Sequence, residues 1–164
     1  MVGLEKRGDG FAIDALYDDE HHDNEHCYIA ARYVMLCTGG IGRVYRYTTN
    51  SAIATGDGIT LAYQMGARIK NLSFVQFHPT AFAGNVREQF LISEAVRGEG
   101  AHLINCHGEQ FMTRYDPRGE LAPRDVVSRG IMAEQSRVGS DKFYLDISYK
   151  DPKFIKERFP MIYG

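Results

Sequence analysis

The chain has 164 residues, 44% of them hydrophobic, and 21 acidic against 19 basic residues give it a net charge of −2. This composition is typical of a globular protein with a packed core, long enough for one domain or parts of two. The balanced charge offers no basic excess for nucleic acid or for an anionic membrane surface. The longest apolar stretch, residues 28–38, is interrupted by Arg32 and is too short to span a bilayer.

Cysteine usage and the N-terminus indicate a reducing compartment. Cys27, Cys37 and Cys106 form no CxxC pair, and no charged region followed by an apolar one marks a secretory signal. We therefore expect free thiols and a cytoplasmic location. The histidine-rich run 21–26 is a weak candidate for a metal site, but we interpret it as a solvated hairpin tip and expect no metal.

The N-terminal residues predict a β-hairpin. Residues 2–6 and 11–17 are strand-like, and the turn between them at 7–10 ends in Asp-Gly. Residues 18–25 are polar and acidic and predict an exposed tip after the second strand.

The next segment predicts α/β-type structure. Residues 27–36 are apolar on both faces, as in a strand buried in a parallel sheet, and a Thr-Gly-Gly turn at 38–40 ends it. A helix is predicted at 59–65, with Asp57 as its N-cap and Gly66 just past its end.

The second half predicts mixed helix and strand with long loops. The predicted elements are extended structure at 67–77, a short helix or turn at 90–96, a helix at 123–136 with Pro123 at its first position, a strand at 143–147, and a short helix at 153–159 stopped by Pro160. Loops rich in Gly, Arg and His, the kind that build sites, begin after a boundary placed near Asn71.

Two glycine-containing turns suggest a nucleotide site. Thr38-Gly39-Gly40, at the end of the predicted strand, would let a flat ligand or a phosphate approach the backbone. The turn at 55–58 precedes a helix, whose amides favour anions, and Asp57 adds a fixed acceptor. A plain tight turn and a plain N-cap explain the same residues equally well.

Three further motifs carry polar side chains suited to a dicarboxylate. His78, held between an aromatic residue and a proline, could donate to a carboxylate, or could be a structural histidine. Ser93 and Glu94 present a hydroxyl and a carboxylate together. Arg97 could join them or form a structural ion pair with Glu94 or Glu99.

Arg124 stands in the first turn of the predicted helix at 123–136. The helix dipole disfavours a cation at that end, which hints at a functional reason for it. A guanidinium matches a carboxylate with two parallel hydrogen bonds. The alternative is an ordinary surface pair of Arg124 with Asp125.

Taken together, these motifs resemble a known family. The segments 54–58, 74–80, 93–101 and 122–125 occur in the order and spacing of the flavoproteins of succinate dehydrogenase, fumarate reductase and L-aspartate oxidase. Further segments, at 45–50, 120–125, 144–148 and 159–163, look like the L-aspartate oxidase branch. In succinate dehydrogenases a glycine usually replaces the proline before the key arginine, here Pro123.

The resemblance implies a fold of mixed α/β and α+β class. Residues 1–71 would be part of an FAD-binding domain, with a β-meander, a sheet strand and a helix, and residues 72–164 would be most of an α+β capping domain. It also implies that the whole enzyme binds FAD and a dicarboxylate such as aspartate, fumarate or succinate. The implied reaction is oxidation of L-aspartate to iminoaspartate, a precursor of quinolinate in NAD biosynthesis, with oxygen or fumarate as acceptor.

The resemblance also implies roles for single residues. Asp57 and the turn Thr38-Gly39-Gly40 would lie near FAD. His78 and Ser93 would bind the dicarboxylate, where many relatives carry Thr in place of Ser93. Arg124 would bind substrate and act as catalytic acid/base, with Glu94 and Arg97 relaying or positioning protons.

The chain contains no Gly-x-Gly-x-x-Gly fingerprint for the FAD pyrophosphate. A strand at residue 2 with no helix before it does not complete a doubly wound sheet, so we expect an internal fragment that neither holds FAD tightly nor turns over alone. Two alternatives stay open at this point: the flavoprotein subunit of a succinate dehydrogenase or fumarate reductase, and a non-catalytic interaction module.

Overall fold

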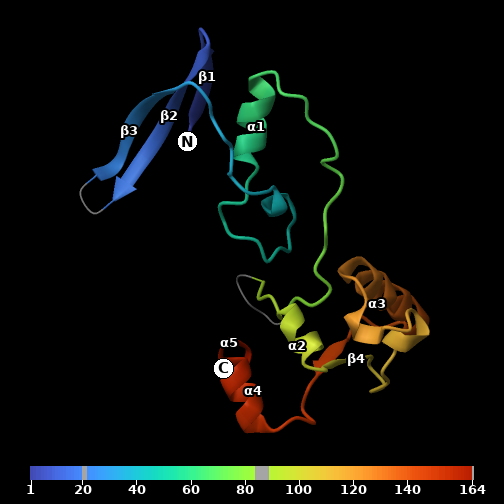
Figure 1. The fold of residues 1–164 in the computed structure, drawn as a ribbon. Helices are drawn as coiled ribbons and strands as arrows, with labels where there is room; N and C mark the ends of the chain where they lie inside the picture. Colours follow the sequence, from blue (N-terminus) through green and yellow to red (C-terminus); the bar gives the residue numbers. More distant parts are fainter. Residues whose placement is uncertain (20–21, 84–88, 164) are drawn as a thin grey trace. The chain divides into compact units, whose positions relative to one another are not determined.

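We describe the protein from a computed structural model, which covers residues 1–19, 22–83 and 89–163 (Figure 1). Contacts between Cα atoms divide the chain into two compact units, residues 1–73 (unit 1) and 74–164 (unit 2). The identity of the two parts as an FAD-binding and a capping domain stays a prediction.

Unit 1 begins with a three-stranded antiparallel sheet in the order β1-β2-β3 (Figure 1). Its strands are β1 (Gly3–Arg7), β2 (Gly10–Asp19) and β3 (His22–Ala31). The predicted hairpin is confirmed, and its tight turn is possible because Gly8 has φ 59, in the left-handed region. Much of the predicted polar tip at 18–25 belongs to strands, because β2 reaches Asp19 and β3 begins at His22; Glu20 and His21 lie outside the described residues.

The prediction of a buried parallel strand at 27–36 is wrong. Its first half belongs to β3, which pairs antiparallel with β2, and residues 32–41 form no strand. Tyr28, Tyr33 and Met35 are 78%, 81% and 88% exposed. An apolar run indicates a buried strand only where other elements cover both its faces, and in the described residues these side chains stay largely exposed. The turn at 38–40 therefore lies in irregular chain and ends no strand.

Helix α1 (Asp57–Gln64) is close to the predicted helix, but its N-cap is Gly56. Asp57 is the first helical residue, so its assignment as the N-cap was wrong. The helix starts two residues earlier than predicted because Gly56, with φ 83, makes the turn into it. Gly66, also with φ 83, follows the helix end as predicted.

Unit 2 contains mixed helix and strand. Its elements are α2 (Glu94–Gly98), β4 (His102–Ile104), α3 (Arg124–Val138), β5 (Tyr144–Asp146), α4 (Pro152–Arg158) and α5 (Pro160–Tyr163), with 3-10 turns at Met112–Arg114 and Gly119–Leu121. The third 3-10 turn, Gly42–Val44, lies in unit 1. Strands β4 and β5 pair antiparallel, so both sheets of the described residues are antiparallel.

Several predicted boundaries in unit 2 shift. Pro123 is the N-cap of α3 rather than its first residue, and Asp151 caps α4 by accepting from the Lys153 amide. Pro160 stops α4 as predicted but also begins α5. Strand β4 was not predicted, and no helix in the described parts of the chain is long and apolar enough to cross a bilayer.

The hydrophobic core lies in unit 2. One cluster, beside α3, consists of Leu103, Phe111, Met112, Ala122 and Val127, and a second consists of Val96, Ala101 and Phe159. Among the described residues of unit 1, no hydrophobic side chain reaches the same degree of burial. Unit 2 thus has its own source of hydrophobic stability and holds the elements that carry the later motifs.

A buried carboxylate ties α3 to the loop before it. Glu134 is fully buried and accepts hydrogen bonds from Asn105 Nδ2 at 2.8 Å, Tyr115 Oη at 2.8 Å and Arg137 Nη2 at 2.7 Å. Arg137, helped by Asn105 and Tyr115, lowers the pKa of Glu134 to about 2. At neutral pH the ionised carboxylate is thereby part of the packing between α3 and residues 105–115.

We expect Glu134→Gln to destabilise unit 2 and to make its stability less sensitive to a fall in pH. The folded pKa of about 2 lies below the ordinary value of 4.5, so this carboxylate's contribution is complete above pH 4.5 and is lost as the pH falls toward 2. Glu134→Gln should lower the free energy of unfolding at pH 7 by about 1–3 kcal/mol.

Denaturant unfolding of the wild type, of Glu134→Gln and of the control Asp125→Asn between pH 7 and pH 2 measures this effect. Asp125 is on the same helix and its side chain is exposed. The fall in stability with acid should be shallower in Glu134→Gln alone. The same slope in all three proteins would contradict the assignment.

Candidate functional site

Helix α2 presents the first polar group of the candidate site. Ser93 caps this helix, and its Oγ accepts from the Ala95 amide at 3.2 Å. Because the hydroxyl oxygen acts as the acceptor there, its O–H stays able to donate to a ligand. The local sequence Ser-Glu favours this start, since serine is a strong N-cap and a glutamate in the first turn suits the helix dipole.

Glu94 and Arg124 form the central contact of the site. Arg124, the first residue of α3, donates from Nε to Glu94 Oε2 at 2.7 Å, and its Nη2 lies 2.6 Å from the same oxygen. The hydrogen bond from Arg124 is the main reason why the pKa of Glu94 lies below its usual value. The alternative pairing of Arg124 with Asp125 is wrong, because Asp125 pairs with Arg129 at 2.7 Å.

Arg97 lies behind Glu94 and is almost fully buried, with 2% of its surface exposed. Its Nη1 donates to the Glu120 carbonyl at 2.6 Å, and its Nη2 lies 3.4 Å from Glu94 Oε1. Burial lowers the pKa of Arg97, and Glu94 acts in the opposite direction. Of its two predicted partners, Glu94 is therefore the one found, and Glu99 instead accepts from Arg158 at 2.9 Å.

His78 faces the same group of charges. Burial, then the guanidinium groups of Arg124 and Arg97, hold the pKa of His78 below its ordinary value. Its Nδ1 accepts from the Thr80 amide at 3.2 Å. A nitrogen that accepts carries no proton, so the neutral ring has its proton on Nε2 and can donate from there.

Gln76 completes this cluster and was not singled out from the sequence. Its Oε1 accepts from Arg124 Nη1 at a long 3.5 Å. It stands two residues before His78 in the same non-helical segment. That spacing was the available signal, because alternate side chains of an extended segment lie on one side.

The structure therefore brings together three of the predicted site residues within unit 2, with Ser93 next to Glu94 in the chain. These are His78, Glu94 and Arg124, joined by Gln76 and Arg97. Two guanidinium groups around one carboxylate leave a local excess of positive charge. Beside a neutral histidine donor and a hydroxyl, this arrangement is suited to binding an organic anion such as a carboxylate.

The predicted nucleotide residues lie in unit 1, around the N-terminus of α1. Thr38 Oγ1 approaches Gly58 so closely that a side chain at this position would collide with it. Asp57 accepts from the Thr55 hydroxyl at 2.8 Å. Beside Gly39 and Gly40, added Cβ atoms would meet open space. A bare glycine backbone, a helix N-terminus and a fixed carboxylate fit the demands of a dinucleotide.

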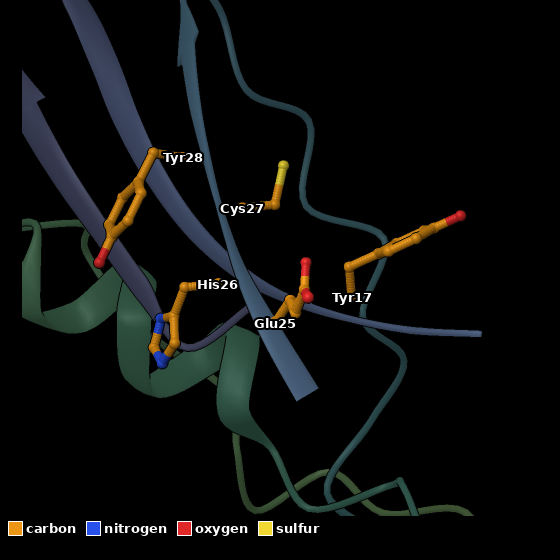
Figure 2. Close-up of a pocket in the computed structure, with 5 residues that line it drawn as sticks. All are labelled: Tyr17, Glu25, His26, Cys27 and Tyr28. Carbon is orange, nitrogen blue, oxygen red and sulfur yellow. The ribbon is translucent and has the colours of Figure 1, made fainter. Parts of the chain in front are cut away.

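Unit 1 also has a shallow depression of about 490 Å³ around β3, lined by Tyr17, Glu25, His26, Cys27 and Tyr28 (Figure 2). His26 and Tyr28 project on one side of the strand, with rings stacked at 6.1 Å, and Cys27 projects on the other. His26 Nδ1 lies 2.8 Å from Asp14 Oδ1. None of the motifs described above contributes to this depression. No group of three metal-binding side chains occurs in residues 1–19, 22–83 and 89–163.

Comparison with known proteins connects these residues to flavoproteins. The model of the family described as "FAD binding domain" matches residues 5–163. An L-aspartate oxidase of Yersinia pestis is 53% identical over 133 residues, which are 81% of this chain and 25% of that protein. An L-aspartate oxidase of Clostridium perfringens is 43% identical over 166 residues, 100% of this chain and 36% of that protein.

Solved structures show the same relationship. The FrdA chain of an E. coli quinol fumarate reductase variant matches 98% of this chain and 30% of its own length, with 32% identity and a TM-score of 0.80. A quinol-fumarate reductase with menaquinol molecules matches 84% of this chain and 26% of its own, with 37% identity and a TM-score of 0.72. The chain thus spans about a quarter to a third of the length of these relatives.

Removing the positive or the negative neighbour of His78 should shift the pKa of this histidine in opposite directions. Arg124→Met removes a cation that lowers the pKa of His78, so this pKa should rise toward its ordinary value. Glu94→Gln removes an anion that raises it, so the pKa should fall further. NMR titration of the His78 ring measures both shifts, with Arg129→Met on the outer part of α3 as a control without effect. Shifts of the same sign in both site variants would contradict the arrangement.

Proposed function

Starting from the fact that the chain belongs to the FAD-binding-domain family of flavoproteins, we propose that it is a segment of an FAD-dependent L-aspartate oxidase. The proposed reaction oxidises L-aspartate to iminoaspartate. The relatives at 43–53% identity that carry this name support the proposal. The single observation that carries it in the structure is the cluster of His78, Glu94 and Arg124.

The cluster supports binding of a dicarboxylate. The Nε2–H of His78 and the hydroxyl of Ser93 are donors suited to one carboxylate of aspartate. Glu94 engages Nε and Nη2 of Arg124. Nη1, with only the long contact to Gln76, is the nitrogen best able to face the substrate.

The chemistry requires that Cα of aspartate loses a hydride and its nitrogen loses a proton, so that the amine becomes an imine. FAD, when bound, supplies the acceptor for the hydride. His78 and Ser93 would fix the substrate so that this C–H bond keeps one direction. Arg124 would stabilise the negative charge of the substrate carboxylates and act as the acid/base, accepting the proton from the nitrogen as it passes one of its own to Glu94.

Glu94 would support that role by holding the guanidinium in place. A guanidinium releases its proton reluctantly, so proton transfer through Arg124 needs a close and ionised partner. Glu94 is such a partner, because the hydrogen bond from Arg124 keeps its pKa low. Arg97, close to the other carboxylate oxygen, would position Glu94 and extend this path.

We assign FAD contacts to Thr38, Gly39, Gly40 and Asp57. The open space beside the two glycines and the crowding of Thr38 against Gly58 support this assignment. Residues 72–164 would then be most of a capping domain that excludes water from the substrate. The proposed whole enzyme is cytoplasmic, uses oxygen or fumarate as its final acceptor, and supplies iminoaspartate for quinolinate and NAD biosynthesis.

A second candidate is the flavoprotein subunit of a fumarate reductase or succinate dehydrogenase. The quinol fumarate reductase structures favour it, at 32% and 37% identity. The L-aspartate oxidases are more similar in sequence, at up to 53%, so we prefer the first candidate. Turnover of aspartate against succinate by the intact flavoprotein distinguishes the two. A non-catalytic module would leave the grouping of His78, Glu94 and Arg124 without a purpose.

Arg124→Lys in the intact flavoprotein should keep the positive charge but lose the guanidinium group that can donate two parallel hydrogen bonds. We expect kcat to fall by about 100-fold or more, with a much smaller rise in KM. Arg129→Lys, on the same helix and in an exposed ion pair, should stay near the wild-type values. Near-normal kcat in Arg124→Lys would exclude a catalytic role for this residue.

The 164-residue chain alone should not retain FAD, because it has no Gly-x-Gly-x-x-Gly fingerprint to hold the pyrophosphate. Visible flavin absorbance after incubation with FAD and gel filtration measures retention, with the full-length flavoprotein as the positive control. A yellow, FAD-saturated preparation of the chain that oxidises aspartate would contradict this prediction.

A further inference from the structure

A short two-stranded ribbon joins the segment of His78 to the start of α2. The Phe82 amide donates to the Phe90 carbonyl at 2.8 Å, and the Ile92 amide donates to the Thr80 carbonyl at 3.1 Å. Ala81 and Leu91 form the antiparallel bridge between these two bonds. Because Ser93 and Glu94 directly follow this ribbon, its register sets how far they lie from His78.

The pair of Thr80 and Ile92 departs from the usual antiparallel pattern. Two residues in a hydrogen-bonded pair normally exchange both N–H···O bonds, but here only the Ile92 amide donates across the ribbon. The Thr80 amide donates to His78 Nδ1 at 3.2 Å instead. The Ile92 carbonyl accepts from the Thr80 hydroxyl at 3.0 Å.

We propose that Thr80 is a positioning residue whose hydroxyl takes the place of its own amide in the ribbon, so that this amide is released to hold His78 as the Nε2–H tautomer. Thr80 is buried, with 6% of its surface exposed, so water does not easily replace either bond. One side chain thereby fixes both the ribbon register and the proton position on the histidine.

The tautomer of His78 decides whether its Nε2 can donate a hydrogen bond to a carboxylate. A neutral histidine with its proton on Nδ1 would present Nε2 as an acceptor, which repels a carboxylate. With the Thr80 amide on Nδ1, the ring presents a donor at Nε2 without needing a positive charge. The binding of a carboxylate by His78 rests on the proposed function, whereas the assignment of the tautomer does not.

Loss of the hydroxyl should disturb the tautomer through the backbone, and it also removes the Thr80 Oγ1 that lies 3.4 Å from His78 Nδ1. In Thr80→Val the Ile92 carbonyl loses its donor and becomes a competitor for the Thr80 amide. Each time the amide pairs with Ile92, His78 Nδ1 loses its donor and the two tautomers come closer in energy. Thr80→Ser keeps the hydroxyl and should keep the single tautomer.

Nitrogen-15 NMR of the histidine rings in the 164-residue chain, without ligand and above the pKa of His78, tests this proposal. The wild type and Thr80→Ser should show the Nε2–H tautomer, and Thr80→Val and Thr80→Ala should show a raised share of the Nδ1–H form. Thr60→Val is the matched control, because it removes a hydroxyl that bonds the Gly56 carbonyl in unit 1.

The proposal is overturned if wild-type His78 is the Nδ1–H tautomer, or if a folded Thr80→Val keeps the wild-type tautomer ratio. If Thr80→Val does not fold, the comparison of Thr80→Ala with Thr80→Ser decides in the same way. A smaller side chain leaves room for the native backbone, so these two variants isolate the hydroxyl.

Succinate binding to the FAD-loaded, full-length flavoprotein separates this proposal from the proposed function. We expect about tenfold weaker binding in Thr80→Val, the size of one charge-assisted hydrogen bond, and wild-type binding in Thr80→Ser. A tautomer shift in the chain together with no succinate binding by the wild-type flavoprotein would uphold the role of Thr80 and overturn the dicarboxylate site.

Discussion

The ion pair of Glu94 with Arg124 is the interaction on which the arrangement of the candidate site depends. It joins the first residue of α2 to the first residue of α3, thirty positions apart in the chain. A glutamate suits the N-terminus of a helix and an arginine does not, because the helix dipole is positive there. The contact with Glu94 offsets this unfavourable placement, and the guanidinium is thereby kept where both helices begin.

Buried Arg97 makes this arrangement more rigid. A guanidinium with 2% exposure is costly unless its donors are satisfied. The Glu120 carbonyl and the carboxylate of Glu94 provide partial compensation. Glu120 in turn accepts from the Leu103 amide at 2.9 Å through its side chain. The loop before α3, strand β4 and α2 are therefore held by one chain of polar contacts, so the positions of the site residues follow from the packing of unit 2.

The sequence predicted what depends on local chemistry. The hairpin at 3–19 and helices α1 and α3 follow from turn residues, capping residues and periodicity, and the structure contains all three. Helix boundaries shifted by one or two residues, because Gly56 and Pro123 took the capping positions. Strand β4 has three residues and is defined by its pairing with β5, so it carries little signal of its own.

The failures concern interactions between distant segments. The run at 27–36 has the composition of a buried strand, but composition does not say which element covers it. In the site, His78, Glu94 and Arg124 were predicted as members of separate motifs. The contacts of Gln76 with Arg124 and of Thr80 with Ile92 were not predicted. Both contacts depend on register between segments, which a single sequence does not specify.

The two units differ in how they hold their functional residues. Unit 2 buries its own core, so the geometry around Arg124 is supported by contacts within the same unit. Unit 1 exposes Tyr33, Met35 and Ile53 almost completely, on the segments that carry Thr38 and Asp57. Covering such apolar side chains is the largest stabilisation available to these segments. The proposed FAD contacts thus lie on segments with exposed apolar side chains, whereas the proposed dicarboxylate ligands are positioned by the packing of their own unit.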